Sequence, residues 1–539
     1  MKLPHWRIVM VAASCVVAVV AIASLLVQFD SKGPDTAVAS TTESIPEGEK
    51  PFGRHGALTA HELAMATVAW SYFVERFQPD TGMVNAVGAF ASTTLWDQAS
   101  YLSGLVSARE LGLIDKQEFD RRAMLFIKTM RNLDLFQGEL PNKVYDTKTA
   151  GKVDYANKPG EIGYSALDIG RLLVWFEIIK QRYPYLASSI DSVVLRWNFC
   201  NVIGQDGNLF GSFVSGNKEV RYVQEGRLGY EQYAAKGFQL WGFNADGAAS
   251  PVPYEFTPIY GVQIPVDGRD PRVFKNKNYV LTESYLLDGL EMNWDLAGDK
   301  SSGPGTASMG WRAEFANRIY LVQQRRFEET GILTARSEHQ VDGAPYFVYD
   351  SIFSDGYAWN TLDPTGVYQP DRAAVSAKAA LGMWALWDTP YTDLLFEAVS
   401  DLSVPGSGFD EGLYENGNGV IPTLTANNNG IILAALLYKV QGPILQYHNQ
   451  NTQLWDTAYP NSDRRRKQCL PPAKVDPTTA SATAPAPVAT PAVPVDQFQL
   501  CRPIVTKTGV AAIHRNLNPV NRRELIGDRR SCAIRVKSP

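Results

Sequence analysis

The sequence is poor in histidine and cysteine, and it lacks the short motifs that mark several common enzyme classes. Only six of its 539 residues are His and five are Cys. It has no P-loop, no GxSxG elbow, no HExxH zinc motif and no GxGxxG after a predicted strand. No CxxC pair or Cys/His spacing indicates zinc, and the acidic loops do not have EF-hand spacing. We therefore expect no metal ion and no cofactor.

Positive charge is also scarce in most of the chain. The net charge is −5, but residues 499–539 carry nine Lys and Arg against two acids, which leaves about −12 on the rest. Nucleic acid attracts basic proteins, so an acidic body argues against nucleic acid as the main partner. The length and the hydrophobic content of 45% allow one large buried core with appendages.

One long uncharged segment lies near the N-terminus. Lys2 and Arg7 precede twenty uncharged, mostly apolar residues, 8–27. A helix of about 20 residues spans about 30 Å, the thickness of the hydrocarbon layer of a membrane. We expect residues 1–28 to form a cytoplasmic N-terminus and a transmembrane signal anchor, with the rest of the chain on the far side of the membrane. A small-residue stretch at 36–40 leaves a cleaved signal peptide open as the alternative.

Changes in composition divide the remaining chain into four parts. We expect a polar tether at residues 29–57 and a large helical domain at 58–460. A linker rich in Pro and Ala follows at 461–498, and a short basic tail at 499–539. A tail of about 40 residues has too small a core to be stable alone, so we predict a disulfide between Cys501 and Cys532. Cys469 is then left over, and Cys200 stands alone in the large domain. The partner of the tail is not defined by its sequence.

Helical signals recur throughout the large domain. Thr59 and Glu62 have capping-box spacing, and apolar residues follow the helical period at 95, 99, 102 and 106. A glycine after polar residues returns at intervals of 56 to 81 residues, as Gly82, Gly138, Gly207, Gly268, Gly331 and Gly412. Each interval fits two helices and their loops. The sequence thus predicts an all-α fold, an (α/α)6 toroid of six helical hairpins with short extended loop segments. An α-solenoid is the alternative, although its repeats are usually shorter.

Acidic residues stand at the expected starts of the inner helices, usually beside an aromatic residue. Asp97 follows Trp96, Glu231 follows Tyr230, and Glu283 has a tyrosine two positions later. In a toroid these helix starts meet at one rim. An acid in the first turn also caps a helix and interacts favourably with its dipole, which is the simpler explanation for any one of them. Their convergence on one opening favours a functional site.

Residues 337–361, SEHQVDGAPYFVYDSIFSDGYAWNT, combine four carboxylates with six aromatic rings, and we expect them to join the same rim. Sugars stack their weakly apolar faces on aromatic rings, and their hydroxyls bind carboxylates, amides and Arg. Hydrolysis of a glycosidic bond needs two carboxyl groups, one protonated and one ionised. The mixture favours a carbohydrate-active protein, most simply a glycoside hydrolase acting on a polysaccharide or oligosaccharide.

We expect Glu231 and Glu283 to form the catalytic pair, with Asp97 and Glu338 in reserve. The predicted substrate-binding residues are Trp96, Glu161, Tyr164, Arg171, Tyr230, Tyr346, Asp355, Tyr357, Trp359 and Asn428. Two other functions stay open. One is a non-catalytic glycan-binding or scaffold subunit of an envelope polysaccharide system. The other is a polysaccharide lyase with His339, Tyr346 or Tyr357 as its base.

Two segments of the large domain resemble a known family. LWDQASYLSGLVSARELGLI and GYSALDIGRLLVWFEII are similar to the bacterial envelope family called domain of unknown function 3131, over roughly residues 58–440. The matching positions are Trp96, Asp97, Tyr101, Ser165, Asp168 and Arg171. The resemblance implies an (α/α)6 toroid related to glycosidases that act on glucans. Together with the anchor expected at residues 8–27, this bacterial envelope family leads us to expect a single-pass protein of the bacterial inner membrane, with the main domain in the periplasm. We expect a glucan or exopolysaccharide as its substrate.

Overall fold

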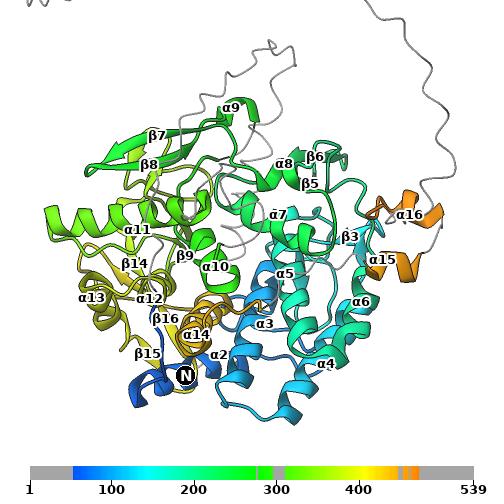
Figure 1. Ribbon diagram of the computed structural model, residues 1–539, viewed down its shortest axis with the longest axis horizontal. Coiled ribbons are helices and arrows are strands. Elements are labelled where there is room, and N and C mark those ends of the chain that lie inside the picture. The colour runs from blue at the N-terminus through cyan, green and yellow to red at the C-terminus, as the bar shows by residue number, and fades with distance from the viewer. Residues whose placement is uncertain (1–52, 275–276, 295–309, 447–452, 460–462, 473–539) are drawn as a thin grey trace, which may run out of the picture. The chain divides into compact units, whose positions relative to one another are not determined.

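Helices of the large domain form two concentric rings in the computed structural model (Figure 1). The structure describes residues 53–274, 277–294, 310–446, 453–459 and 463–472. The inner helices are α3 (Leu95–Glu110), α5 (Ala166–Arg182), α7 (Tyr230–Leu240), α10 (Glu283–Met292), α12 (Ala377–Leu386) and α14 (Ala426–Gln441). Each packs against the next, and α14 packs against α3, so the ring closes. This closure confirms the predicted toroid and excludes the open solenoid.

The outer helices alternate with the inner ones along the chain. They are α2 (Ala60–Glu75), α4 (Lys116–Asn132), α6 (Ala187–Val194), α8 (Asp246–Ala249), α11 (Trp311–Thr330) and α13 (Pro390–Val399). Each of the six glycines in the predicted repeat lies between an outer helix and the next inner helix. The predicted capping box of Thr59 and Glu62 opens α2. Periodicity and turn chemistry are local properties, which is why the sequence shows them.

The fold is not all-α, because the long connections into the inner helices pair with one another as strands. The two-stranded sheets are β1 (Ser92–Thr94) with β4 (Val144–Asp146), β2 (Leu135–Phe136) with β3 (Leu140–Pro141), β5 (Phe210–Val214) with β6 (Val220–Gln224), β7 (Tyr254–Ile259) with β8 (Val262–Asp267), and β11 (Phe353–Ser354) with β12 (Tyr357–Ala358). In the three-stranded sheet, β10 (Phe347–Asp350) pairs with β9 (Glu338–Gln340) and with β13 (Thr361–Leu362). In the four-stranded sheet, β16 (Gly408–Tyr414) pairs with β14 (Ala374–Ser376), β15 (Ser403–Val404) and β17 (Val420–Leu424). All pair antiparallel. Backbone groups in partly buried connections need hydrogen-bond partners, and short antiparallel ladders supply them.

The inner helices have almost no exposed face. Every residue of α10 and of α12 is buried. A charged side chain inside such a ring needs a partner, since an unpaired buried charge is strongly destabilising. Asp288 of α10, for example, pairs with Lys236 of α7 at 2.6 Å and with Arg312 of α11 at 2.7 Å. Polar groups of the inner ring are therefore fixed in place by their partners.

Glycines let neighbouring inner helices approach closely. A Cβ atom on Gly237 of α7 would lie 1.9 Å from the carbonyl oxygen of Gly170 in α5. A Cβ atom on Gly430 of α14 would lie 2.5 Å from the carbonyl oxygen of Ser100 in α3. The backbones of these helix pairs are thus in contact, and residues on either side of the contact keep a fixed relation at the rim.

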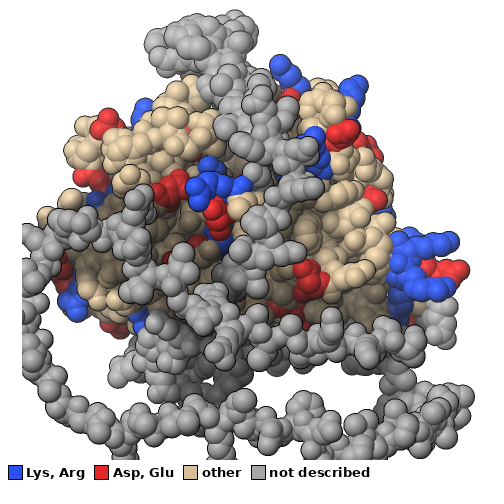
Figure 2. Space-filling view, turned by 90° about the horizontal axis from the view of Figure 1, so that it is seen from above, with Lys and Arg blue, Asp and Glu red and all other residues tan. Residues whose placement is uncertain are grey.

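The packed chain continues beyond residue 460, where the sequence predicted a linker. Trp455 of α15 (Gln453–Ala458) is fully buried and donates a hydrogen bond from Nε1 to the Trp241 carbonyl oxygen at 2.7 Å. After α16 (Asp463–Lys467), Cys469 forms a disulfide with Cys200. Cys469, which the predicted tail disulfide left over, thus pairs with the cysteine that stood alone in the large domain. The exposed basic residues of α16 contribute to the group of Lys and Arg at the right of Figure 2.

Two predicted features lie outside the described residues. They are the transmembrane segment at 8–27 and the Cys501–Cys532 disulfide of the tail. Within the described ranges, no helix combines the length and the apolar character needed to cross a membrane.

Loss of the disulfide should destabilise the domain. Replacing Cys200 and Cys469 together by Ser should lower the free energy of unfolding by about 2–4 kcal/mol, because a cross-link over a long loop restricts the unfolded chain. The bond joins residues 269 positions apart in sequence. Guanidinium unfolding under non-reducing conditions measures the change. Serine at Cys501 and Cys532 is the control and should leave the main transition unchanged. An unshifted transition in the Cys200/Cys469 variant would contradict the prediction.

Candidate active site

The first turns of the inner helices converge on the carboxylate of Glu283, the first residue of α10. Glu283 is 1% exposed. It accepts hydrogen bonds from Trp96 Nε1 and Asn427 Nδ2, both at 2.9 Å, and forms an ion pair with Lys378 Nζ at 2.5 Å. Trp96, Lys378 and Asn427 are the second residues of α3, α12 and α14. One buried carboxylate thus joins four of the inner helices.

The two remaining inner helices complete this arrangement. Arg171 of α5 donates from Nη1 to Asn427 Oδ1 at 3.0 Å, and its guanidinium lies 4.5 Å from the centre of the Trp96 ring. Tyr230 of α7 lies against the same indole, with ring centres 5.7 Å apart. Because Asn427 Oδ1 accepts from Arg171, its Nδ2 is left to donate to Glu283. We call these six residues, one from each inner helix, the rim cluster.

A second carboxylate, Glu338 of β9, adjoins the rim cluster. It accepts from the Tyr230 hydroxyl at 2.8 Å and from Arg227 Nη2 at 3.1 Å, and its side chain is 14% exposed. The Arg227 guanidinium lies 4.5 Å from the centre of the Tyr230 ring and 5.3 Å from that of Tyr349.

Four aromatic residues near these carboxylates form what we call the aromatic wall: Trp96, Tyr230, Tyr349 and Tyr279. Trp96 contacts Tyr230, and the ring centres of Tyr349 and Tyr279 are 5.0 Å apart. Arg227 stacks between the two pairs. Tyr230 and Tyr279 are buried, whereas Trp96 and Tyr349 are partly exposed. The exposed parts of Trp96 and Tyr349 offer flat apolar faces on which a sugar ring can stack.

Glu283 and Glu338 have pKa values shifted in opposite directions. Burial raises the pKa of Glu283, but the charges of Lys378 and Arg171 outweigh this effect and lower the pKa below its usual value. Burial raises the pKa of Glu338, and the negative charge of Glu283 raises it further against the opposing charge of Arg227. Glu283 is therefore the more readily ionised of the two carboxyl groups, and Glu338 is the one that keeps its proton to higher pH. A general acid and a base require this combination.

Lys378 is a cation shared by several acids. Burial lowers its pKa, but Glu283, Glu411 and Glu338 raise it above the usual value, so it remains charged. Burial raises the pKa of Glu411 of β16 to about 7. The pKa of Asp97 is also raised by burial, against its hydrogen bonds with Thr94.

Asp168 and Glu225 form a further carboxyl pair beside α5. Burial and then the charge of Glu225 raise the pKa of Asp168 to about 7. Glu225 itself accepts a hydrogen bond from the backbone N–H of Ala166, the first residue of α5. Ser165 caps the helix by accepting from the backbone N–H of Asp168.

Glu231, one of the two predicted catalytic acids, lies elsewhere. It is fully buried, and its carboxylate pairs with Arg269 Nη1 at 2.9 Å and accepts a hydrogen bond from Gln224. It shares none of these partners with Glu283. Successive helical residues point about 100° apart, so Tyr230 faces the rim cluster while Glu231 faces β6 and Arg269. Glu231 and Glu283 thus have separate sets of partners, and burial raises the pKa of Glu231 to about 7.

Three predicted binding residues have structural roles away from the rim cluster. Glu161 is exposed and pairs with Lys152. Tyr164 is a buried core residue that packs on Phe136. Asn428 is buried and donates from Nδ2 to the backbone oxygen of Asp410 at 2.9 Å, while its neighbour Asn427 reaches Glu283.

The stretch 337–361 contributes only part of its length to the rim. Glu338 and Tyr349 join the aromatic wall, whereas Trp359 lies beneath Arg326 of the outer helix α11, with the guanidinium 4.5 Å from the ring centre. Tyr357 is 70% exposed at the β11–β12 hairpin, and Asp355 in the same turn is exposed. Tyr346 is half-buried. The expected lyase base His339 is 1% exposed, and burial lowers its pKa to about 4.

Several rim residues were not singled out in the sequence. Lys378 gave a signal, because it is the lone charge in an apolar helix and so needs a buried partner. Asn427 has the same place in α14 that Trp96 has in α3, the second residue of the helix. Tyr349 belonged to the aromatic stretch at 337–361 but was not chosen as a binding residue. Arg227 and Glu411 gave no local signal, since their positions depend on contacts far from the helix starts.

The fold is similar to that of several solved structures whose names refer to glucan-acting enzymes. One is a glucoamylase-like protein from Bacteroides uniformis ATCC 8492, with a TM-score of 0.54, 12% identity, and coverage of 75% of this chain and 98% of that chain. Another is the endo-β-1,2-glucanase from Chitinophaga pinensis in complex with sophorotriose and glucose, with a TM-score of 0.53, 12% identity, and coverage of 74% and 98%. At this identity the likeness concerns the fold alone.

No protein with a curated description matches the chain in sequence. A sequence profile of the family described as "protein of unknown function (DUF3131)" matches residues 64–442 and confirms the resemblance found around Trp96 and Arg171. The chain therefore belongs to the DUF3131 family.

Proposed function

We propose that this protein is a glycoside hydrolase that acts on a glucan or exopolysaccharide, with Glu338 as general acid and Glu283 as the ionised partner. The observation that carries the proposal is the opposite direction of the two pKa shifts beside the aromatic wall. The toroidal fold shared with glucan-acting proteins supports it. Fold alone does not define function, so the weight rests on the carboxyl groups.

In the proposed reaction, a sugar of the polymer stacks on the aromatic wall. Protonated Glu338 gives its proton to the glycosidic oxygen as the bond to the anomeric carbon breaks. The Tyr230 hydroxyl and Arg227, which both donate to Glu338, hold its carboxyl group in position. A water molecule forms the new bond to the anomeric carbon. Ionised Glu283 takes the proton of that water as base, or stabilises the positive charge that develops on the sugar before the water adds. Lys378 keeps Glu283 ionised, and Trp96 and Asn427 fix its orientation.

A specific observation favours a second candidate, a glycan-binding protein without hydrolytic activity. Glu283 is 1% exposed and has three partners, as a purely structural carboxylate would. The aromatic wall alone suffices for sugar binding. Incubation of the purified protein with linear and cyclic glucans and acidic exopolysaccharides separates the two functions, because only a hydrolase releases new reducing ends.

Removal of either proposed catalytic carboxyl should abolish most of the activity. Glu283→Gln and Glu338→Gln should each lower the rate of glucan cleavage by about 10²- to 10⁴-fold, the usual contribution of acid–base catalysis. Reducing-end release under saturating substrate measures the loss, with circular dichroism as the test of folding. Glu231→Gln is the matched control, since it also alters a buried acid at an inner-helix start, and it should retain activity. Wild-type rates in folded Glu283→Gln or Glu338→Gln would refute the assignment.

Removal of Lys378 should move the pH profile of cleavage upward. Lys378 lowers the pKa of both Glu283 and Glu338. In Lys378→Met, the ammonium charge no longer opposes the effect of burial on the pKa of Glu283. Glu283 then becomes protonated at a higher pH, and the acid limb of the kcat/KM profile shifts to higher pH. Glu338 keeps its proton to a higher pH, and the basic limb shifts in the same direction.

The control for this prediction is Lys439→Met, which removes a half-buried Lys paired with Glu62 at 2.6 Å, outside the rim cluster. Its profile should coincide with that of the wild type. A Lys378→Met profile that stays in place, or that moves to lower pH, would contradict the proposed roles of both carboxyls.

We also propose that residues 8–27 anchor the protein in the bacterial inner membrane, with the toroid in the periplasm. The uncharged segment after Lys2 and Arg7 supports an anchor, and the Cys200–Cys469 disulfide supports an oxidising compartment. Cell fractionation should recover the protein in membranes, from which detergent but not high salt releases it. A soluble mature form that begins near residue 40 would show instead that the segment is a cleaved signal.

A further inference from the structure

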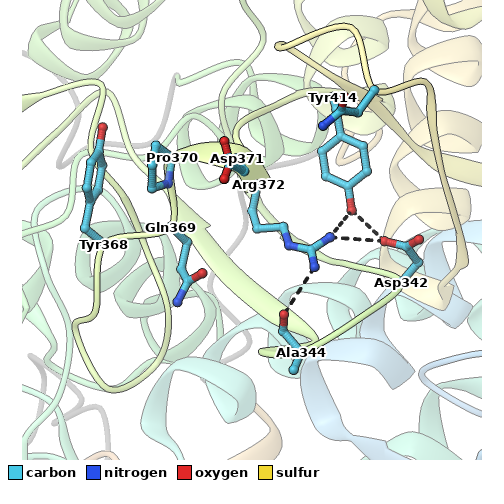
Figure 3. A pocket seen from close by; sticks show the side chains of 9 residues that line it. Asp342, Ala344, Tyr368, Gln369, Pro370, Asp371, Arg372 and Tyr414 are labelled. Atoms are coloured by element: carbon cyan, nitrogen blue, oxygen red, sulfur yellow. Dashed lines mark hydrogen bonds and ion pairs between the residues drawn. The ribbon is translucent and has the colours of Figure 1, made fainter.

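A polar pocket of about 720 Å³ lies outside the rim cluster (Figure 3). Its wall holds an interlocked triad. Arg372 Nη1 donates to the Tyr414 hydroxyl at 2.9 Å and lies 3.4 Å from Asp342 Oδ1, and the Tyr414 hydroxyl donates to the same Asp342 oxygen at 2.6 Å. Tyr368, Gln369 and Asn418 also line the pocket. None of these residues belongs to the rim cluster or the aromatic wall.

A second pocket of about 360 Å³ adjoins the first, because both are lined by Tyr368 and Pro370. Trp359 and Ala358 line the second pocket. We call the two pockets together the outer groove. Rings of Trp359, Tyr368 and Tyr414 are thus distributed along a groove whose other lining groups are mostly polar. This is the composition of a sugar-binding surface, in which rings stack on sugar faces and polar groups bind hydroxyls.

The groove is preformed. The Asp363 carboxylate oxygen Oδ1 accepts from the backbone N–H groups of Thr365 and Val367 at 2.8 and 3.0 Å, which fixes the loop before Tyr368. Behind the triad, Tyr414 packs in a small apolar cluster with Val341, Val348, Ala374 and Ile421. The Tyr368 ring is nevertheless 58% exposed. A rigid loop that presents an exposed ring loses little conformational entropy when a ligand stacks on that ring.

The charges of the groove favour a neutral ligand. Arg372 pairs with Asp342, and both Arg326 and Arg336 pair with Glu415. Asp371 adds a further exposed carboxylate to the lining. Each guanidinium in the lining is already engaged by a carboxylate, so the groove offers an acidic sugar no uncompensated cation. Hydroxyl groups, by contrast, can bind to the edges of these ion pairs.

The outer groove lies close to the rim cluster along the chain. Glu338 and Asp342 are four residues apart, and Glu411 and Tyr414 are three residues apart in β16. At about 3.3 Å per extended residue, the first pair is at most about 13 Å apart. The backbone positions of the proposed general acid and of the groove triad therefore lie within the length of a short oligosaccharide.

We propose that the outer groove is a second binding site for a neutral glycan, which holds a distant part of the same polymer chain. Tyr368 supplies the stacking platform, and the Arg372–Asp342–Tyr414 triad binds hydroxyl groups. The inference rests on the proposed function for its polymer substrate, but binding at the groove does not require cleavage. It predicts that the groove prefers a neutral glycan to an acidic one.

Affinity electrophoresis of the full chain in the Glu338→Gln background tests the proposal without consuming the polymer. The probes are a linear β-1,2-glucan, a linear β-1,3-glucan, and alginate as an acidic polymer. Tyr368→Ala and Arg372→Met should each weaken binding of a neutral glucan about five- to tenfold, and alginate should not retard the protein. Tyr185→Ala is the matched control, because that ring is 51% exposed on η1 (Pro184–Leu186), between α5 and α6, and its loss should change nothing.

Three results would overturn the proposal: no retardation by either neutral glucan, unchanged retardation in Tyr368→Ala, or alginate binding that the groove variants abolish. Tyr368 is exposed, so its variant remains decisive even if Arg372→Met fails to fold. In the active background, Tyr368→Ala should raise KM for the polymer and leave kcat and short oligosaccharides unaffected. If the protein cleaves no glucan, the proposed hydrolase function fails, and the electrophoresis still decides whether the groove binds one.

Discussion

The buried ion pair of Glu283 and Lys378 is the constraint on which the rim depends. It places a carboxylate with 1% exposure against an ammonium with a side chain only 4% exposed, at the point where the inner helices begin. Removal of either partner would leave an unpaired buried charge, which strongly destabilises a fold. Trp96 and Asn427 donate hydrogen bonds to the carboxylate, and Arg171 and Tyr230 pack against the Trp96 ring. The contacts that hold the inner helices together at the rim are therefore the same contacts that assemble the site.

Close helix contacts and buried charges support each other in this fold. Gly170 with Gly237, and Gly430 with Ser100, allow backbones to touch, which fixes the rotation of each helix relative to its neighbour. The rotation decides which first-turn side chains face inward. The strands β9 and β16 then bring Glu338 and Glu411 toward the same cation. A rigid support of this kind is what a pair of carboxyls with separated pKa values needs.

The sequence predicted the toroid because its signals are local: capping boxes, helical periodicity and turn glycines. It predicted an all-α fold wrongly, because ladders such as β7–β8 depend on which connections meet across the rim. It also placed Cys200 alone, while the structure pairs it with Cys469 across 269 residues. Of the expected acids, Glu283 lies in the rim cluster, Glu338 contacts Tyr230 of that cluster, and Glu231 pairs with Arg269 instead. All three look alike in sequence, as acids near aromatic residues.

The sequence by itself determined the helical hairpins, the positions of the acids at the helix starts and the mixture of rings and carboxylates that sugars match. Only the tertiary structure decided which acid faces which partner. Asn427 rather than Asn428 reaches Glu283, and Tyr230 rather than Glu231 faces the rim cluster, because one residue along a helix turns a side chain by about 100°. The pKa of each acid then follows from burial and from charges such as Lys378, which lie on other helices and leave no trace in the local sequence.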